Sequence, residues 1–182
     1  MNNIINVAVL GSTGYVGNEL VKILSNHKNV NINFLGSESI NNEYLVNFES
    51  NKKYTNLPLV QNNKNFDPSI SEYVFLALPH GVSNEYVNKY INKIKIIDLS
   101  ADFRLDNINL YTKVYGDNHI CSEYLNNFIY GLVEINKTII AKSSNIAVPG
   151  CYPTSILLPL IPLIKNNLIK TNNIIIDSKS GY

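Results

Sequence analysis

The feature that most constrains the fold is a glycine-rich turn placed directly after an apolar run near the N-terminus. Residues 4–10 are almost entirely apolar, which predicts a strand buried on both faces of a parallel sheet. Gly11, Gly14 and Gly17 follow with G-x-x-G-x-x-G spacing, and the apolar positions in residues 16–24 fit one face of a helix. In such a turn the backbone can approach a pyrophosphate, and the helix N-terminus offers N–H donors. The turn predicts a dinucleotide site, although the same glycines would also serve tight packing alone.

Strand and helix patterns alternate along the chain, which predicts an α/β fold with a doubly wound parallel sheet. Residues 40–70 are rich in Asn and carry no pattern from which an element can be placed, and residues 106–140 indicate only short mixed elements. Besides the first strand and helix, we expect strands at residues 31–35, 73–78, 94–99 and 145–148 and a helix at residues 82–91.

The last part of the chain combines a proline-flanked turn with an apolar run. The turn spans residues 149–154, and a helix is expected to start near Thr154. Pro159 and Pro162 interrupt the apolar run, so this helix should be kinked or shorter than the pattern suggests. Residues 174–176 predict one more strand.

Composition excludes several classes of function. The net charge of +1 provides no bulk field for nucleic acid or a membrane surface, and no run approaches the roughly 18 apolar residues of a membrane span. Two cysteines without paired spacing argue against a disulfide scaffold or a zinc site, so no metal is expected. The chain begins without the basic segment and cleavage site of a signal peptide, and we expect a cytoplasmic protein.

A single arginine stands out in a lysine-rich chain. The sequence has 14 Lys, 30 Asn and one Arg, a bias that makes Arg104 more informative than an arginine usually is. Its guanidinium suits bidentate binding of a carboxylate or phosphate. The alternative is a surface ion pair with Asp102 or Asp106, which would contribute little to stability.

Cys151 is the candidate nucleophile. It lies between Gly150 and Tyr152 just before a predicted helix, where N–H groups and the helix dipole lower the pKa of a thiol. A buried, inert cysteine is the alternative, and it is the role expected for Cys121.

Two further sites follow predicted strands at the edge of the sheet where ligands bind in this architecture, one at Ser37 and Glu38 and one at His80. Ser37 and Glu38 lie about 20 residues past the glycine turn, where a hydroxyl suits the 2′-phosphate of NADP and a carboxylate suits the ribose of NAD. Glu38 could also be a solvated loop residue. His80 could line the cofactor cleft or have no role.

Together these motifs resemble N-acetyl-gamma-glutamyl-phosphate reductase, a family of the aspartate-semialdehyde dehydrogenase superfamily. The resemblance spans nearly the whole chain, and the Ser-Ala-Asp-Phe-Arg and Pro-Gly-Cys-Tyr-Pro-Thr stretches are its most specific parts. The matching segments are residues 11–20, 75–83, 97–105, 115–116 with His119 and Glu123, 130–134, and 149–154.

The resemblance implies an NADPH-dependent reductase that converts a small-molecule acyl phosphate, N-acetylglutamyl 5-phosphate, to the 5-semialdehyde in arginine biosynthesis. It implies that Cys151 is the acylated nucleophile and that Arg104 binds substrate. It also implies a Rossmann-type domain at residues 1–148 and the incomplete beginning of an α+β catalytic domain at residues 149–182. For the full-length family it implies a homo-oligomer, and the oligomeric state of this chain is left open. The residues implied to bind the cofactor are Gly11, Ser12, Thr13, Gly14, Val16 and Ser37, with Leu78, Pro79 and His80 on the nicotinamide side.

The chain departs from the family pattern in ways that leave other functions open. Val148 stands where the family has Asn, and Glu38 stands where it has Arg, so NAD is an alternative cofactor. The family runs to about twice this length, with its catalytic histidine beyond position 182 and a glycine-rich turn that starts at residues 180–181. The alternatives are a remnant that at most binds nucleotide and a relative acting on an aminoadipyl phosphate. We also expect exposed apolar surface on residues 156–164 and 174–176, inviting association.

Overall fold

The computed structural model describes residues 4–116 and 118–179, and its center is a parallel β-sheet. In the described part of the chain the sheet has seven strands in the order β3-β2-β1-β4-β5-β7-β6, and every neighbouring pair is parallel. This confirms the expected Rossmann-type sheet. The strands are β1 (Ile5–Leu10), β2 (Val30–Ser37), β3 (Val60–Asn62), β4 (Tyr73–Leu76), β5 (Lys95–Asp98), β6 (Ile129–Tyr130) and β7 (Asn145–Ala147).

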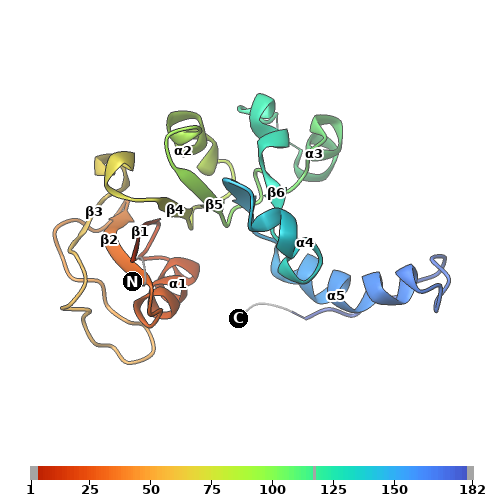
Figure 1. Cartoon of the computed structure of the whole chain (residues 1–182), viewed down its shortest axis with the longest axis horizontal. Helices are drawn as coiled ribbons and strands as arrows, with labels where there is room; N and C mark the ends of the chain where they lie inside the picture. The colour runs from red at the N-terminus through yellow and green to blue at the C-terminus, as the bar shows by residue number, and fades with distance from the viewer. Residues whose placement is uncertain (1–3, 117, 180–182) are drawn as a thin grey trace.

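Helices lie on both sides of the sheet, with α1 and α4 on one side and α2 and α3 on the other (Figure 1). The connection from β2 to β3 is a long irregular loop, which explains why no element could be placed there from the sequence. The α-helices are α1 (Tyr15–Ser25), α2 (Ser83–Tyr90), α3 (Ile108–Tyr115), α4 (Val133–Ile140) and α5 (Cys151–Lys165), and the 3₁₀ helices are η1 (Asn63–Asn65), η2 (Pro68–Ile70) and η3 (Ser122–Asn127).

The strand β1 supplies residues to two hydrophobic clusters because successive side chains point to opposite faces of the sheet. Val7 and Val9 belong to the same cluster as Val21 of α1. Ala8 and Leu10 belong to the other cluster, which includes the aromatic side chains of α2. Burial on both faces is the reason why the run reads as continuously apolar and not as alternating.

The helix α5 is longer than the sequence suggested. It begins at Cys151, three residues before the expected start at Thr154, and continues through Pro159 and Pro162 to Lys165. Of the two alternatives, the shorter helix is therefore wrong, and a kink at the prolines stays a prediction. No residue of α5 is buried, so water can bond the carbonyl groups that the two prolines leave without an N–H partner.

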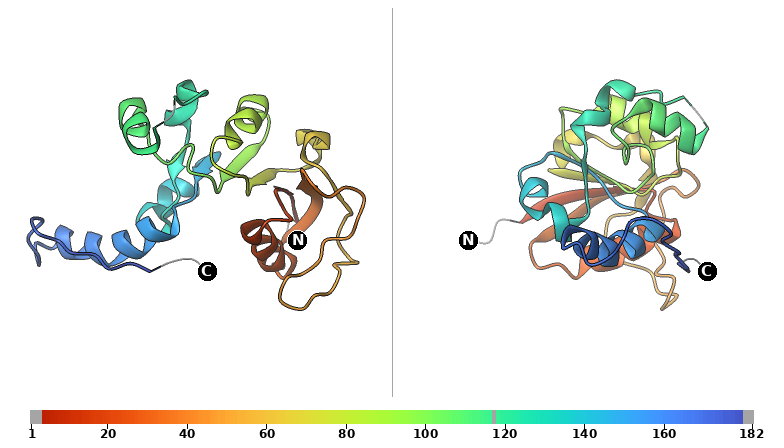
Figure 2. Two further views of the ribbon diagram at one scale, coloured as in Figure 1. Left: turned by 180° about the vertical axis from the view of Figure 1, so that it is seen from behind. Right: turned by 90° about the vertical axis from the view of Figure 1, so that its right-hand side faces the viewer.

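The expected strand at residues 174–176 does not form. This segment has no regular structure and runs back along α5, where Ser178 and Ser155 share a hydrogen bond (Figure 2). A strand needs a neighbour with which to pair, and no described strand lies beside this one. The family motif at residues 180–181 falls outside the described residues.

Apolar surface is exposed on both C-terminal segments, as expected. Figure 1 shows α5 extending away from the sheet, and the side chains of Ile164 and Ile175 are 36% and 95% exposed. The predicted boundary between residues 148 and 149 lies in the connection from β7 to α5, and the division into two domains stays a prediction. No helix among the described residues is both long and apolar enough to cross a membrane.

Candidate active site

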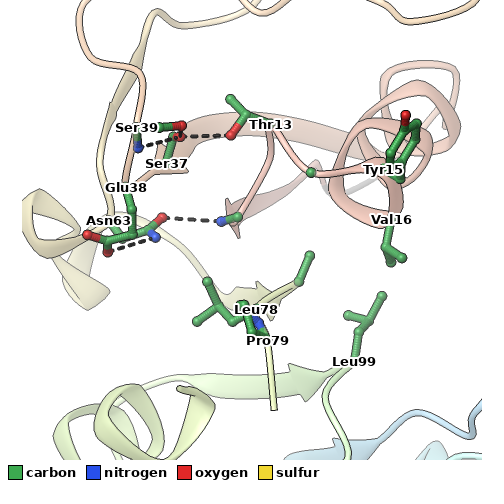
Figure 3. Close-up of a pocket in the computed structure, with 13 residues that line it drawn as sticks. Thr13, Tyr15, Val16, Ser37, Glu38, Ser39, Asn63, Leu78, Pro79 and Leu99 are labelled. Carbon is green, nitrogen blue, oxygen red and sulfur yellow. Dashed lines mark hydrogen bonds between the residues drawn. The ribbon is translucent and has the colours of Figure 1, made fainter. Parts of the chain in front are cut away.

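A pocket lies at the carboxyl ends of β1, β2 and β4, which is where an open parallel sheet binds its ligands. Its volume is about 400 Å³. Figure 3 shows Glu38, Ser39 and Asn63 at one end of the pocket and Val16 and Leu99 at the other. The complete lining is Gly11, Thr13, Gly14, Tyr15, Val16, Ser37, Glu38, Ser39, Asn63, Ala77, Leu78, Pro79 and Leu99.

Most of the residues that the resemblance assigns to the cofactor meet in this pocket, and two do not line it. Ser12 is fully buried and fastens the turn to β2, because its N–H and Oγ both donate to the carbonyl of Gly36, at 2.8 and 3.0 Å. His80 instead contacts Asp102, in the loop that follows β5. The assigned residues that line the pocket are Gly11, Thr13, Gly14, Val16, Ser37, Leu78 and Pro79, and their contacts with a cofactor stay predictions.

The glycine turn is tightly packed and also leaves the start of α1 suited to an anion. Gly11 has a φ of 80°, and a Cβ on it would lie 2.2 Å from the carbonyl oxygen of Ala77. A Cβ on Gly17 would lie 2.1 Å from the carbonyl oxygen of Gly11. Gly14 is the N-cap of α1, no side chain caps this helix, and its first turn has no acidic residue. The packing role and the phosphate role of these glycines are therefore compatible.

Asn63 lines the pocket and links two parts of it, and the sequence did not reveal this. It is buried, its Oδ1 accepts a bond from the N–H of Gly11 at 3.2 Å, and its Nδ2 donates to Glu38 Oε1 at 3.1 Å. A Cβ on Gly36 would lie 2.3 Å from Asn63 Oδ1, so a glycine there lets the amide approach. In a chain with 30 Asn, nothing in the local pattern marks this one.

Glu38 is exposed, as a solvated loop residue would be, but its carboxylate is also held by two hydrogen bonds. Its Oε1 accepts the bond from Asn63 and a second bond from the hydroxyl of Tyr86 at 2.9 Å. Burial, and then the bond to the carboxylate, raises the pKa of the Tyr86 hydroxyl above its usual value. Tyr86 therefore stays a donor to Glu38 throughout the neutral pH range.

Arg104 lies against the turn that carries the candidate nucleophile. Its Nε donates to the carbonyl of Val148 at 2.7 Å, and its Nη2 donates to the carbonyl of Leu99 at 2.9 Å. A Cβ on Gly150 would lie only 2.9 Å from Arg104 Nη1. Among the described residues Arg104 takes part in no ion pair, so the alternative pairs with Asp102 and Asp106 are not formed.

Asp102 joins the loops that follow β4 and β5. Its side chain is fully buried, and Oδ1 accepts bonds from the N–H of Gly81 at 2.8 Å and from His80 Nδ1 at 2.6 Å. On the other side of the imidazole, His80 Nε2 lies 3.3 Å from the hydroxyl of Tyr111. His119 Nε2 lies 2.8 Å from the backbone carbonyl of Asp102. His80 therefore holds the loop that leads to Arg104, and a role at the nicotinamide stays a prediction.

The two cysteines lie in opposite environments. Cys151 is exposed at the first position of α5, with Gly150 as N-cap, where the helix dipole favours negative charge. Cys121 is buried and donates from Sγ to the carbonyl of Asn84 at 3.3 Å, and burial raises the pKa of its thiol. Cys121 thus has the inert environment expected of it. In the part of the chain that the structure describes, no three His, Cys, Asp or Glu side chains gather as a metal site requires.

Comparisons with family models and with curated sequences agree on one family. A family model described as "Semialdehyde dehydrogenase, NAD binding domain" matches residues 6–143, and one described as "Semialdehyde dehydrogenase, dimerisation domain" matches residues 151–182. N-acetyl-gamma-glutamyl-phosphate reductase of Ehrlichia canis is 46% identical over 97% of this chain and 51% of its own length. The probable chloroplastic enzyme of that name in Arabidopsis thaliana is 41% identical over 97% of this chain and 44% of its own length.

Solved structures share the fold at lower identity. Aspartate semialdehyde dehydrogenase II of Vibrio cholerae superposes with a TM-score of 0.66 at 22% identity, covering 90% of this chain and 47% of its own. Aspartate semialdehyde dehydrogenase of Candida albicans, solved with NADP, gives a TM-score of 0.55 at 16% identity, covering 90% and 48%. The chain spans about half the length of the curated relatives it matches. It belongs to the semialdehyde dehydrogenase family, and these curated relatives carry the name N-acetyl-gamma-glutamyl-phosphate reductase.

Proposed function

We propose that this protein reduces N-acetyl-L-glutamyl 5-phosphate to N-acetyl-L-glutamate 5-semialdehyde with release of phosphate. The names of relatives at 41% and 46% identity support this reaction. The observation within the chain that carries the proposal is the position of Arg104 against the turn of Cys151. A side chain suited to bind an anion thus lies against Gly150, the residue before the exposed Cys151.

The residues present suit a nicotinamide dinucleotide. The glycine turn and the start of α1 would hold its pyrophosphate, and Leu78 and Pro79 would pack against its rings. NADPH is the form that the family resemblance implies. When bound, the dihydronicotinamide supplies the hydride for the reduction.

Cys151 and Arg104 would carry the acyl-transfer half of the reaction. Arg104 would bind an anionic group of the substrate and so orient its acyl carbon toward the thiol. The thiolate of Cys151 would attack that carbon, the bond from carbon to the phosphate oxygen would break, and inorganic phosphate would leave. The product on the chain is a thioester, which divides one difficult step into two easier ones.

Acylation of Cys151 can be measured on the 182-residue chain itself. Incubation with N-acetylglutamyl phosphate should add one acyl group to Cys151, seen by intact mass and peptide mapping, and should release an equal amount of phosphate. Cys151→Ser should reduce the rate of phosphate release by about 10² or more. The matched control is Cys121→Ser, which should still be acylated.

Other outcomes would separate the remaining functions. Unchanged phosphate release from Cys151→Ser would show that another group is the nucleophile. A wild-type chain that binds dinucleotide but is never acylated would support a nucleotide-binding remnant. Faster acylation by the acyl phosphate with one more methylene would support a relative acting on an aminoadipyl substrate.

A further inference from the structure

Glu38 is the charged residue of the pocket. The other residues that line it are apolar, glycine, or neutral and polar, and no lysine or arginine is among them. Lys64 follows Asn63 in the chain but does not line the pocket. A 2′-phosphate bound at this end would therefore face a carboxylate, with no lining cation to compensate.

The hydroxyl of Ser37, which would serve a ribose phosphate, is already engaged within the protein. Ser37 is buried, and its Oγ accepts bonds from the N–H groups of Ser39 and Ile40, both at 3.2 Å. The same oxygen shares a hydrogen bond of 2.7 Å with Thr13 Oγ1. With these three bonds the Ser37 oxygen holds the loop after β2 in place.

The carboxylate of Glu38 is fixed in a way that suits a hydroxyl donor. Both of its protein donors, Asn63 Nδ2 and the Tyr86 hydroxyl, bond to Oε1. No described residue donates to Oε2, which leaves that oxygen to accept from a ligand. Because Asn63 also holds the N–H of Gly11, the carboxylate and the glycine turn are positioned by the same side chain.

We propose that Glu38 makes this site select the unphosphorylated dinucleotide, NAD(H), over NADP(H). The vicinal ribose hydroxyls of NAD(H) can donate to the fixed carboxylate, whereas the doubly charged 2′-phosphate is repelled by it. The proposal rests on the proposed function for the presence of a dinucleotide, and it replaces the NADPH of the family resemblance with NADH in this chain.

Binding of NAD⁺ and NADP⁺ to the 182-residue chain, measured by calorimetry without any turnover, tests the proposal. NADP⁺ should bind at least about tenfold more weakly, a difference of about 1.4 kcal/mol. Glu38→Gln keeps an acceptor for Asn63 and Tyr86 but removes the charge, so NADP⁺ should bind about tenfold more tightly. In the same variant the affinity for NAD⁺ should change by less than about threefold. The control is Glu43→Gln, which changes an exposed carboxylate outside the pocket and should leave the ratio of the NAD⁺ and NADP⁺ affinities unchanged.

A salt titration of the wild type serves as the second measurement, and it does not depend on the folding of any variant. The difference in binding affinity between NAD⁺ and NADP⁺ should decrease as the salt concentration rises from about 0.05 to 0.5 M, because salt screens the repulsion between Glu38 and the 2′-phosphate. Equal or tighter binding of NADP⁺ to the wild type at low salt would overturn the proposal while leaving the proposed function intact. Failure of both dinucleotides to bind would instead remove the cofactor site and the proposed function with it.

Discussion

Asp98, the last residue of β5, is fully buried beside the loop of Arg104. Burial raises the pKa of its carboxyl to about 6 from an ordinary value of 3.8, and bonds from the hydroxyl and N–H of Ser100 oppose the rise. The folded protein therefore holds this proton to a higher pH than the unfolded chain does. The stability that Asp98 contributes is complete below about pH 4 and is lost as the pH rises through 6.

Asp98→Asn should abolish this dependence, because the amide keeps the shape and has no charge to bury. With the pKa raised from 3.8 to about 6, the wild type should lose about 2 kcal/mol of unfolding free energy relative to the variant between pH 4 and pH 7. Urea unfolding at both pH values measures the difference. Asp106→Asn, at an exposed position, is the control, and an equal pH dependence in wild type and Asp98→Asn would contradict the assignment.

For single residues, the sequence indicated candidate site residues by their rarity or by their place in a turn. Arg104 and Cys151 are candidates because one is the only arginine and the other lies between prolines at a helix start, and their roles stay predictions. Asn63 could not be predicted, since its role depends on a contact with Gly11 that is 52 residues away in the chain. The bond between Ser37 and Thr13, which are 24 residues apart in the chain, was hidden for the same reason.

The glycine turn between β1 and α1 shows how closely one element is adapted to another. Gly17→Ala would normally stabilise a helix by up to about 1 kcal/mol. Here its Cβ would overlap the carbonyl oxygen of Gly11, so we expect a net loss of about 2 kcal/mol in the free energy of unfolding. Gly14→Ala is the matched control, because its Cβ would lie 3.6 Å from the same oxygen, and it should cost less than about 1 kcal/mol.

Urea unfolding of the two variants gives these values directly. A Gly17→Ala protein as stable as the wild type would show that the turn can widen without cost.

The elements themselves were predictable where burial imposes a pattern, as in β1, β4 and β5. The 3₁₀ helix η1 and the start of α5 were not, because polar caps and exposed turns leave no periodicity in the sequence.

For the whole molecule, the exposed apolar side chains of α5 and of residues 174–176 predict self-association. Sedimentation velocity should show a weight-average mass that rises with concentration, because the exposed patch is covered when two chains meet. Ile164→Lys together with Ile175→Lys should shift the protein toward the monomer. The control is Ile23→Lys on α1, which is 59% exposed but lies away from this surface, and a wild type that stays monomeric at all concentrations would contradict the prediction.

The strand order also has a consequence for synthesis of the chain. β1 lies inside the sheet between β2 and β4, and β4 begins only at Tyr73. During translation at about 5–20 residues per second, one edge of β1 stays open for several seconds after the first β–α–β unit has left the ribosome. The segment between β2 and β4 is rich in asparagine, and its strand β3 pairs with β2, so it leaves the open edge of β1 to β4.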